Sequence, residues 1–356
     1  MKRFKRLFIL LALTILTIVA LATLGNVELN WQTLERVQWG WMVVVVVIFY
    51  STILVRGIRW HRILQAMGWA PGLRYTSTLM IAGLFISAIL PARLGDIGRV
   101  VLLKQDHKIP MAHGIASIAT ERALDVFSIL FLAIGGGLWA LQGRLPIEYL
   151  QLMIGTAILL LLGLVGLLLM PKLEQWLRVS LPRLFYPASS PAPRIWVIYH
   201  KLLDFGFSMI HGVRALGKHP GALLIALGQS FYIWLGDGLL IYFTLVSIKA
   251  TAPLSVTLFS MMVSDLIAAV PITPGAIGQF EVALAGILTV LGVARADSTL
   301  GAILLRLVSL WTLIPVSGLI TYIFGFSRAL DLTPNSVMAE GEFVPTPSSA
   351  ASSLDG

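Results

Sequence analysis

One apolar stretch of this chain is interrupted in a way that limits how it can fold. Apolar sequence runs from Pro253 to Val270 and again from Val282 to Val293, and the segment between them, Pro271 to Glu281, contains two prolines and two glycines. Proline lacks an amide donor and clashes with the preceding turn, so a helix cannot continue through this segment. Unpaired backbone is not tolerated in hydrocarbon unless protein or water covers it. The sequence therefore predicts two half-helices meeting beside a packed interior or a polar cavity, and a loop outside the bilayer is the alternative.

A second interruption lies in the first half of the chain, between Leu90 and Arg99. It follows an apolar segment from Leu79 to Leu90 and combines a proline and two glycines with ionisable residues. Two interrupted hydrophobic segments, one in each half of a chain, are typical of transporters with a binding site near the bilayer midplane. The pair of interruptions therefore favours a transporter.

Composition places the chain in a membrane. Of its 356 residues, 57% are hydrophobic and 12% are charged, which no ordinary soluble domain matches. The absence of cysteine excludes disulfides and thiolate metal sites. The net charge of +9 is spread over loops between apolar segments, so it indicates membrane topology rather than binding to nucleic acid.

We expect an all-α polytopic membrane protein with about six transmembrane helices and two re-entrant broken-helix hairpins. The first span could instead be a cleaved signal peptide, although its apolar run exceeds the ~7–15 residues of a signal core. The predicted spans are residues 7–24, 41–55, 112–141, 150–170, 222–247 and 300–324, and the hairpins are 75–104 and 253–293.

The distribution of basic residues supports this topology. Of the 26 Lys and Arg residues, two lie in predicted spans, few lie outside, and the rest face the cytoplasm, as the positive-inside rule requires. Complete crossings by the broken segments would weaken that bias, so hairpins entering from opposite faces are favoured, as in an inverted repeat. Both termini are then cytoplasmic. The outside residues are Arg36, Arg144, Lys249 and Arg295, and those in spans are Arg122 and Arg306.

The chain is predicted to comprise one transmembrane domain, residues 1–330, and a disordered cytoplasmic tail, residues 331–356. Within the domain, residues 171–218 form a cytoplasmic linker and an amphipathic helix lying on the membrane. The tail contains too little apolar sequence to fold alone.

Ionisable residues at membrane depth are the candidate site. Each costs ~2.5–3.5 kcal/mol on a lipid-facing helix, so these groups must pair or line a polar cavity. We expect Arg93 or Arg99 to pair with Glu121 or Asp125, and Arg306 to pair with Glu281 or Asp265. Pairs that only lock helices together are the alternative. The ten residues are Arg93, Asp96, Arg99, Glu121, Arg122, Asp125, Asp237, Asp265, Glu281 and Arg306.

Other residues receive narrower roles. Arg56, Arg59 and Trp60 follow the second span and suit anionic headgroups at the cytoplasmic surface, or simply anchor that span. Asp237, Asp265 and Glu281 are candidate proton carriers. The sequence has no P-loop, metal-ligand cluster or serine nucleophile motif, so no cofactor is expected and ATP does not drive transport directly.

With these motifs in view, the chain resembles the transmembrane region of the lysylphosphatidylglycerol synthase family, whose members are flippase-like integral membrane proteins. Small departures from the family pattern occur at Ser87-Ala88, Asp96 and Ala276. The soluble aminoacyltransferase domain of full-length lysyl-lipid synthases is missing, so the resemblance implies lipid translocation without lipid synthesis. The residues that carry it are Arg56–Trp60, Leu90–Arg99, Glu121–Asp125, Pro271–Glu281 and Arg306-Leu307.

We therefore expect translocation of a phospholipid or lipid-linked headgroup across a bacterial-type inner (plasma) membrane. Arginine forks suit phosphate oxygens, and the carboxylates suit cationic headgroup parts or hold the arginines in place. The expected partners are anionic or zwitterionic membrane lipids, a second copy of the chain or a separate lipid-modifying enzyme, and no nucleic acid. A membrane enzyme transferring a sugar or aminoacyl group to a lipid, and a non-transporting scaffold, remain alternatives. The expected substrate-binding residues are Arg93, Asp96, Arg99, Glu121, Arg122, Asp125, Asp265, Pro274, Gly275, Gly278, Glu281 and Arg306.

Overall fold

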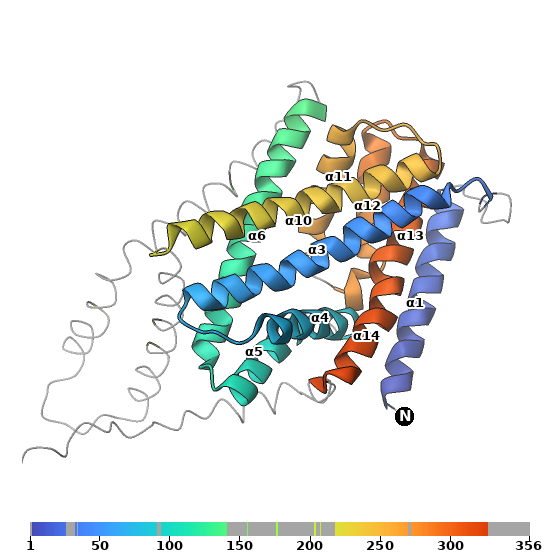
Figure 1. Cartoon of the computed structure of the whole chain (residues 1–356). Helices are drawn as coiled ribbons and strands as arrows, with labels where there is room; N and C mark the ends of the chain where they lie inside the picture. The colour runs from blue at the N-terminus through green and yellow to red at the C-terminus, as the bar shows by residue number, and fades with distance from the viewer. Residues whose placement is uncertain are drawn as a thin grey trace, which may run out of the picture.

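A computed structural model describes residues 2–25, 35–90, 94–140, 218–269 and 272–326, with a few isolated positions between these ranges. Throughout these ranges the chain is helical, without strands, and the helices form one bundle (Figure 1). The helices are α1 (Lys2–Leu24), α3 (Trp39–Ala66), α4 (Leu73–Ile89), α5 (Leu94–His107), α6 (Met111–Ala140), α10 (Pro220–Ser247), α11 (Leu254–Ile267), α12 (Gln279–Val290), α13 (Arg295–Arg306) and α14 (Leu313–Ile323).

The predicted fold class, an all-helical polytopic membrane protein, is confirmed. Four helices in the described ranges are long and apolar enough to cross a membrane, namely Trp39–Ala66, Met111–Ala140, Pro220–Ser247 and Arg295–Ile323. The count of six crossings stays a prediction. The predicted span 150–170, the linker and amphipathic helix within 171–218, and the tail 331–356 lie outside the described ranges, apart from isolated positions.

Both predicted helix breaks are present. Helix α4 ends at Ile89 and α5 begins at Leu94, while α11 ends at Ile267 and α12 begins at Gln279. The second break contains a short 3-10 turn, Pro274–Ala276. Its glycines adopt the left-handed region, with φ of 60° at Gly275 and 85° at Gly278, which a residue without Cβ reaches at little cost.

The two broken hairpins start from opposite ends of the bundle. Helices α3 and α10 pack side by side (Figure 1), and the amide of Gln38 before α3 donates to the carbonyl oxygen of Ser247 at the end of α10, at 2.7 Å. The pair is therefore antiparallel. Helix α4 follows the end of α3, and α11 follows the end of α10. The first hairpin therefore begins at one end of the bundle and the second begins at the opposite end.

Each hairpin also returns to the end it came from. In the first, the Tyr75 hydroxyl near the start of α4 donates to Asp106 near the end of α5, at 2.9 Å. In the second, the chain leaves α12 for α13, where Gly301 packs against Leu245 near the end of α10. This is the re-entrant arrangement expected from the charge distribution.

The tips of the hairpins meet inside the bundle. A Cβ on Gly275 would lie 3.3 Å from the carbonyl oxygen of Ala88, at the end of α4. Ala88, Ile277, Leu310 and Ile314 form a small apolar cluster there. A larger apolar core fills the space among α3, α6, α10, α11, α12 and α13. The two breaks, far apart in sequence, therefore share one place in the fold.

Candidate functional site

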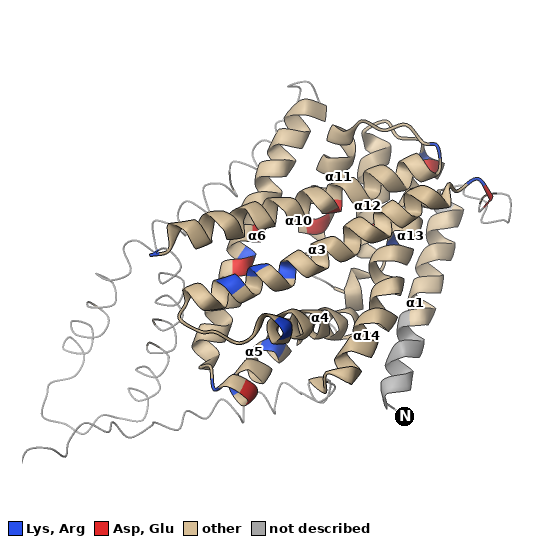
Figure 2. Cartoon of the chain, viewed as in Figure 1, with Lys and Arg blue, Asp and Glu red and all other residues tan. Residues whose placement is uncertain are grey.

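A cavity of about 310 Å³ lies between the hairpin tips and the α3–α10 pair. Figure 2 shows Lys, Arg, Asp and Glu within the bundle as well as at its ends. Among these charged residues, the ones that line the cavity are Arg56, Asp96, Arg99, Glu121, Arg122, Asp125, Asp237, Asp265 and Arg306.

Three arginines and three carboxylates on one side of this cavity form a closed ring of ion pairs. We call this set, Arg59, Asp96, Arg99, Glu121, Arg122 and Asp125, the charge ring. Around it the nitrogen–oxygen distances are 2.8 Å for Arg99–Asp96, 2.9 Å for Asp96–Arg122, 3.5 Å for Arg122–Asp125, 2.6 Å for Asp125–Arg59, 3.2 Å for Arg59–Glu121 and 3.1 Å for Glu121–Arg99. The ring is balanced in charge and joins α3, α5 and α6.

Neighbouring groups fix the ring in place. The indole N–H of Trp234 on α10 donates to Asp125 at 2.9 Å, and Arg59 donates to Ser230 on the same helix. The Arg99 guanidinium lies 4.6 Å from the ring centre of Trp60, a cation–π distance. The ring therefore connects α10 to the three helices that supply its members.

The expected headgroup surface at Arg56, Arg59 and Trp60 is wrong. Arg59 and Trp60 are completely buried, and the Arg56 side chain is 18% exposed and faces the central cavity. The reason is that α3 continues to Ala66, so these residues lie along its packed side rather than beyond the end of a span. Their cationic groups meet carboxylates of α6 and α10 instead of lipid.

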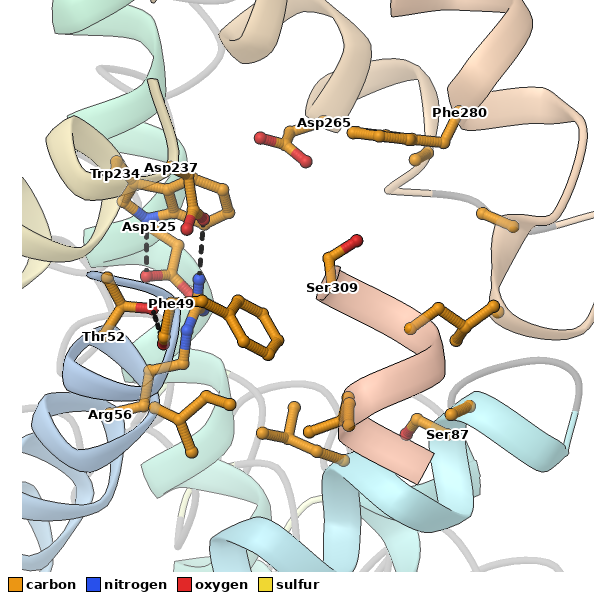
Figure 3. A pocket seen from close by; sticks show the side chains of 18 of the residues that line it. Phe49, Thr52, Arg56, Ser87, Asp125, Trp234, Asp237, Asp265, Phe280 and Ser309 are labelled. Atoms are coloured by element: carbon orange, nitrogen blue, oxygen red, sulfur yellow. Dashed lines mark hydrogen bonds and ion pairs between the residues drawn. The ribbon is translucent and has the colours of Figure 1, made fainter. Parts of the chain in front are cut away.

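Arg56 forms a separate ion pair on the cavity wall. Its guanidinium donates to Asp237 on α10 at 3.0 Å and lies 5.0 Å from the Trp234 ring centre. Figure 3 shows this pair beside Asp125, on the wall opposite Phe280. Asp237, expected as a proton carrier, is thus paired with Arg56, which was expected at the membrane surface.

Arg306 forms the corresponding pair at the second hairpin. Its Nε donates to Glu281 at 2.5 Å and its Nη2 to the Gly275 carbonyl oxygen at 2.6 Å. The other Glu281 oxygen accepts the Gly278 amide at 2.8 Å, so this carboxylate caps α12 as well. Directly after Arg306 the helix widens into a π-helical segment, Leu307–Thr312, a distortion frequent at functional sites.

Most of the predicted site residues come together here. The expected Arg99–Glu121 and Arg306–Glu281 pairs form. Asp265 lines the far wall, where Figure 3 shows its carboxylate and Ser309 directed into the same open space.

Four predicted site residues are placed differently. Pro274 and Gly278 shape the turn and are not among the described residues lining the central cavity. Glu281 borders a narrow gap against α1, behind Arg306. Arg93 lies outside the described ranges.

Sequence reasoning missed Arg59 as the partner of Asp125 and Arg56 as the partner of Asp237. One signal could have found them. Positions 56 and 59 are three apart and share a helix face, and the later spans carry more acidic than basic residues.

The arginines around the cavity fall into two groups. Within the described ranges, each arginine of the charge ring faces two carboxylates, whereas Arg56 and Arg306 each face one. Guanidinium groups with fewer carboxylate partners are the better candidates to donate hydrogen bonds to phosphate oxygens. The arrangement can therefore bind a small polar group that carries phosphate.

The family that matches this chain is the one that its motifs resemble. Residues 7–317 match the family model described as the lysylphosphatidylglycerol synthase TM region. A UPF0104 membrane protein of Methanocaldococcus jannaschii is 26% identical over 67% of this chain and 94% of its own. Another, of Methanothermobacter thermautotrophicus, is 23% identical over 85% of this chain and 89% of its own. The glycosyltransferase AglD of Haloferax volcanii is 24% identical over 73% of this chain and 45% of its own.

Proposed function

Because this chain belongs to the lysylphosphatidylglycerol synthase transmembrane-region family, as its motifs predicted, we propose that it moves the headgroup of a phospholipid or lipid-linked molecule across the membrane. The observation that carries the proposal is the charged cavity at the meeting point of two hairpins that enter from opposite ends. Translocation requires a polar site that each side of the membrane can reach in turn, and this cavity lies where hairpins from the two ends meet. A scaffold, by contrast, gives no reason for a cavity lined by charge.

The cavity suits a headgroup rather than a whole lipid. Its volume of about 310 Å³ is at the lower end of the roughly 300–1,000 Å³ of small-molecule sites. Acyl chains would then stay in the bilayer while the headgroup passes. Both signs of charge line the cavity, so an anionic or zwitterionic headgroup is the proposed substrate.

In this proposal Arg56 and Arg306 contact the phosphate from opposite walls. Each exchanges its single carboxylate partner, Asp237 or Glu281, for a phosphate oxygen. A carboxylate released in this way can take up a proton, which retains the proton-coupling role for Asp237 and Glu281. The charge ring, whose arginines already face two carboxylates each, holds α3, α5 and α6 at fixed spacing while this exchange occurs.

The test is lipid transfer in vesicles containing the purified chain. Fluorescent phospholipids in the inner leaflet are protected from an impermeant reductant until they cross. We expect the wild-type chain to accelerate their loss, and Arg56→Gln and Arg306→Gln each to slow it about tenfold or more, as removal of a charged contact implies. Arg74→Gln is the control, because Arg74 stacks on Phe324 and does not line the cavity. Wild-type rates in both cavity variants would refute the proposal.

A second candidate is transfer of a sugar or aminoacyl group to a lipid, by this chain or by a separate enzyme bound to it. The similarity to a protein named as a glycosyltransferase favours it, although the match spans 45% of that protein. Mass spectrometry of lipids incubated with the chain and a sugar-nucleotide or aminoacyl-tRNA donor tests it. A modified lipid would favour this candidate, and unmodified lipid together with transfer in vesicles would favour translocation.

The proposed location is a bacterial-type inner membrane with both termini in the cytoplasm. That orientation places the first hairpin on the cytoplasmic side and the second on the outer side. It rests on the distribution of Lys and Arg along the chain.

A further inference from the structure

A second cavity, of about 740 Å³, lies where α3 ends and α10 begins. Its basic residues are His61 and Arg62 on α3 and Lys218 and His219 just before α10. Among the described residues, none that lines this cavity also lines the central one. It is therefore a separate feature of the bundle, which we call the end cavity.

The end cavity is electropositive. Its positive charge comes from Arg62 and Lys218, and its described lining contains no Asp or Glu. Helix α10 begins in it with Pro220 in the first turn, and the N-terminus of a helix of 28 residues carries a partial positive charge. Among the residues that the structure describes, no atom would lie within 4 Å of a Cβ on Gly221 in this helix start. An anion can approach the exposed first turn of α10 there.

Apolar side chains adjoin the basic ones. Ile58, Leu73 and Ile225 also line the end cavity, and Leu73 and Ile225 are 46% and 48% exposed. Both α3 and α10 are long and apolar enough to cross a membrane, and these helix ends lie at the depth of the headgroups in such an arrangement. A ligand here meets positive charge on one side and hydrocarbon on the other.

We propose that the end cavity binds a phosphate-bearing anion, supplied by an anionic phospholipid of the adjacent leaflet. Basic pockets between membrane helices are a recognised setting for anionic headgroups. Arg62 and Lys218 contact the phosphate, and the first turn of α10 faces it. This site lies about one helical turn beyond the surface that sequence reasoning assigned to Arg56, Arg59 and Trp60, and it does not depend on translocation through the central cavity.

The experiment measures thermal unfolding of the full chain in neutral detergent. The additives are short-chain phosphatidylglycerol, short-chain phosphatidylcholine and inorganic phosphate. We expect phosphatidylglycerol to raise the unfolding temperature more than phosphatidylcholine does. Arg62→Gln combined with Lys218→Gln is expected to weaken the phosphatidylglycerol response about tenfold or more in concentration. Lys108→Gln removes one charge at an exposed position of the same bundle end, outside the cavity, and keeps the response.

Two matched variants at Gly221 distinguish the loss of anion binding from misfolding. Gly221→Glu places a carboxylate at the start of α10, where it also suits the helix N-terminus, whereas Gly221→Gln fills the same place without charge. We expect the glutamate variant to lose the phosphatidylglycerol response and the glutamine variant to keep most of it. A wild-type response in the Gly221→Glu variant or in the double variant would overturn the site. Equal stabilisation by inorganic phosphate would assign it to a soluble anion and overturn the lipid source.

Discussion

Arg59 and Asp125 show how single charged residues control the stability of the buried ion pairs. Arg59 has no exposed surface, and it bonds to both acidic residues of the α6 motif and to Ser230. A buried ion pair adds little over an apolar pair, but loss of one partner leaves an unpaired buried charge. The charge ring is therefore sensitive to neutralisation of any one member, most of all where solvent cannot compensate.

Asp125→Asn should consequently be more damaging than Asp96→Asn. Both carboxylates belong to the charge ring, but the Asp125 side chain is 4% exposed and that of Asp96 is 23% exposed. Asp125→Asn is expected to cost about 3–5 kcal/mol of unfolding free energy, and Asp96→Asn clearly less. Denaturant unfolding of both variants in detergent measures the difference. Equal losses would mean that solvent exposure does not control the energetics of the ring.

At the scale of elements, the broken hairpins depend on close backbone approach. A Cβ on Gly95 of α5 would lie 1.9 Å from the Gly83 carbonyl oxygen of α4, so these half-helices touch through backbone. On α6, Gly136 also approaches backbone closely, since its added Cβ would lie 3.4 Å from the Phe259 amide nitrogen of α11. A Cβ on Gly135, by contrast, would meet no atom of the described residues within 4 Å.

Gly95→Ala is therefore expected to unfold or separate the first hairpin. The added methyl group would collide with rigid backbone, and the unfolding temperature should fall sharply or folded protein should be lost. Gly135→Ala is the matched control: in an exposed helical position alanine is favoured over glycine by about 1 kcal/mol. Thermal unfolding of the two variants makes the comparison. A stable Gly95→Ala protein would show that α4 and α5 can move apart.

Gly275→Ala should affect lipid transfer more than folding. Its φ of 60° costs a residue with a Cβ about 1–2 kcal/mol, and the Cβ would press on the Ala88 carbonyl oxygen at 3.3 Å. We expect a slower transfer rate in vesicles with a modest loss of stability. Gly228→Ala on α10 is the control, because no atom of the described residues lies within 4 Å of its added Cβ. Equal rates in the two variants would argue against a role for the tip contact.

The breaks were predictable because proline and glycine act locally, as at Pro274 and Gly275. The excess of charge at membrane depth was predictable too, because each buried charge needs a partner. The Arg99–Glu121 and Arg306–Glu281 pairs were among those expected, but the partners of Arg56 and Arg59 were not predictable from sequence alone. Helix α3 continues to Ala66 and packs against α4, α6 and α10. Arg59, which in the sequence resembles the end of a membrane span, is therefore buried inside the bundle. The central cavity likewise depends on how the two hairpins meet.

For the whole molecule, the two hairpins mark the two opposite ends of the bundle. The end of α5 and the loop between α10 and α11 lie at opposite ends of the bundle. The chain contains no cysteine, so any introduced thiol reports without background.

Lys108→Cys and Thr251→Cys, both at exposed positions, should therefore react from opposite sides of the membrane. An impermeant maleimide applied to intact cells is expected to label Thr251→Cys, and Lys108→Cys only after the membrane is opened, given the proposed orientation. Labelling from the reverse sides would invert the orientation and leave the fold intact. Labelling of both positions from one side would contradict the opposed hairpins.

The contact between Gly275 and the Ala88 carbonyl has a consequence for any passage through the bundle. A bilayer has a hydrocarbon thickness of about 30 Å, yet here the two backbone breaks approach each other directly, with the apolar side chains of Ile277, Leu310 and Ile314 around them. If the chain moves a headgroup as proposed, separation of the two hairpin tips would change the central cavity without breaking the ion pairs of the charge ring, whereas separation of α3, α5 and α6 would have to break them.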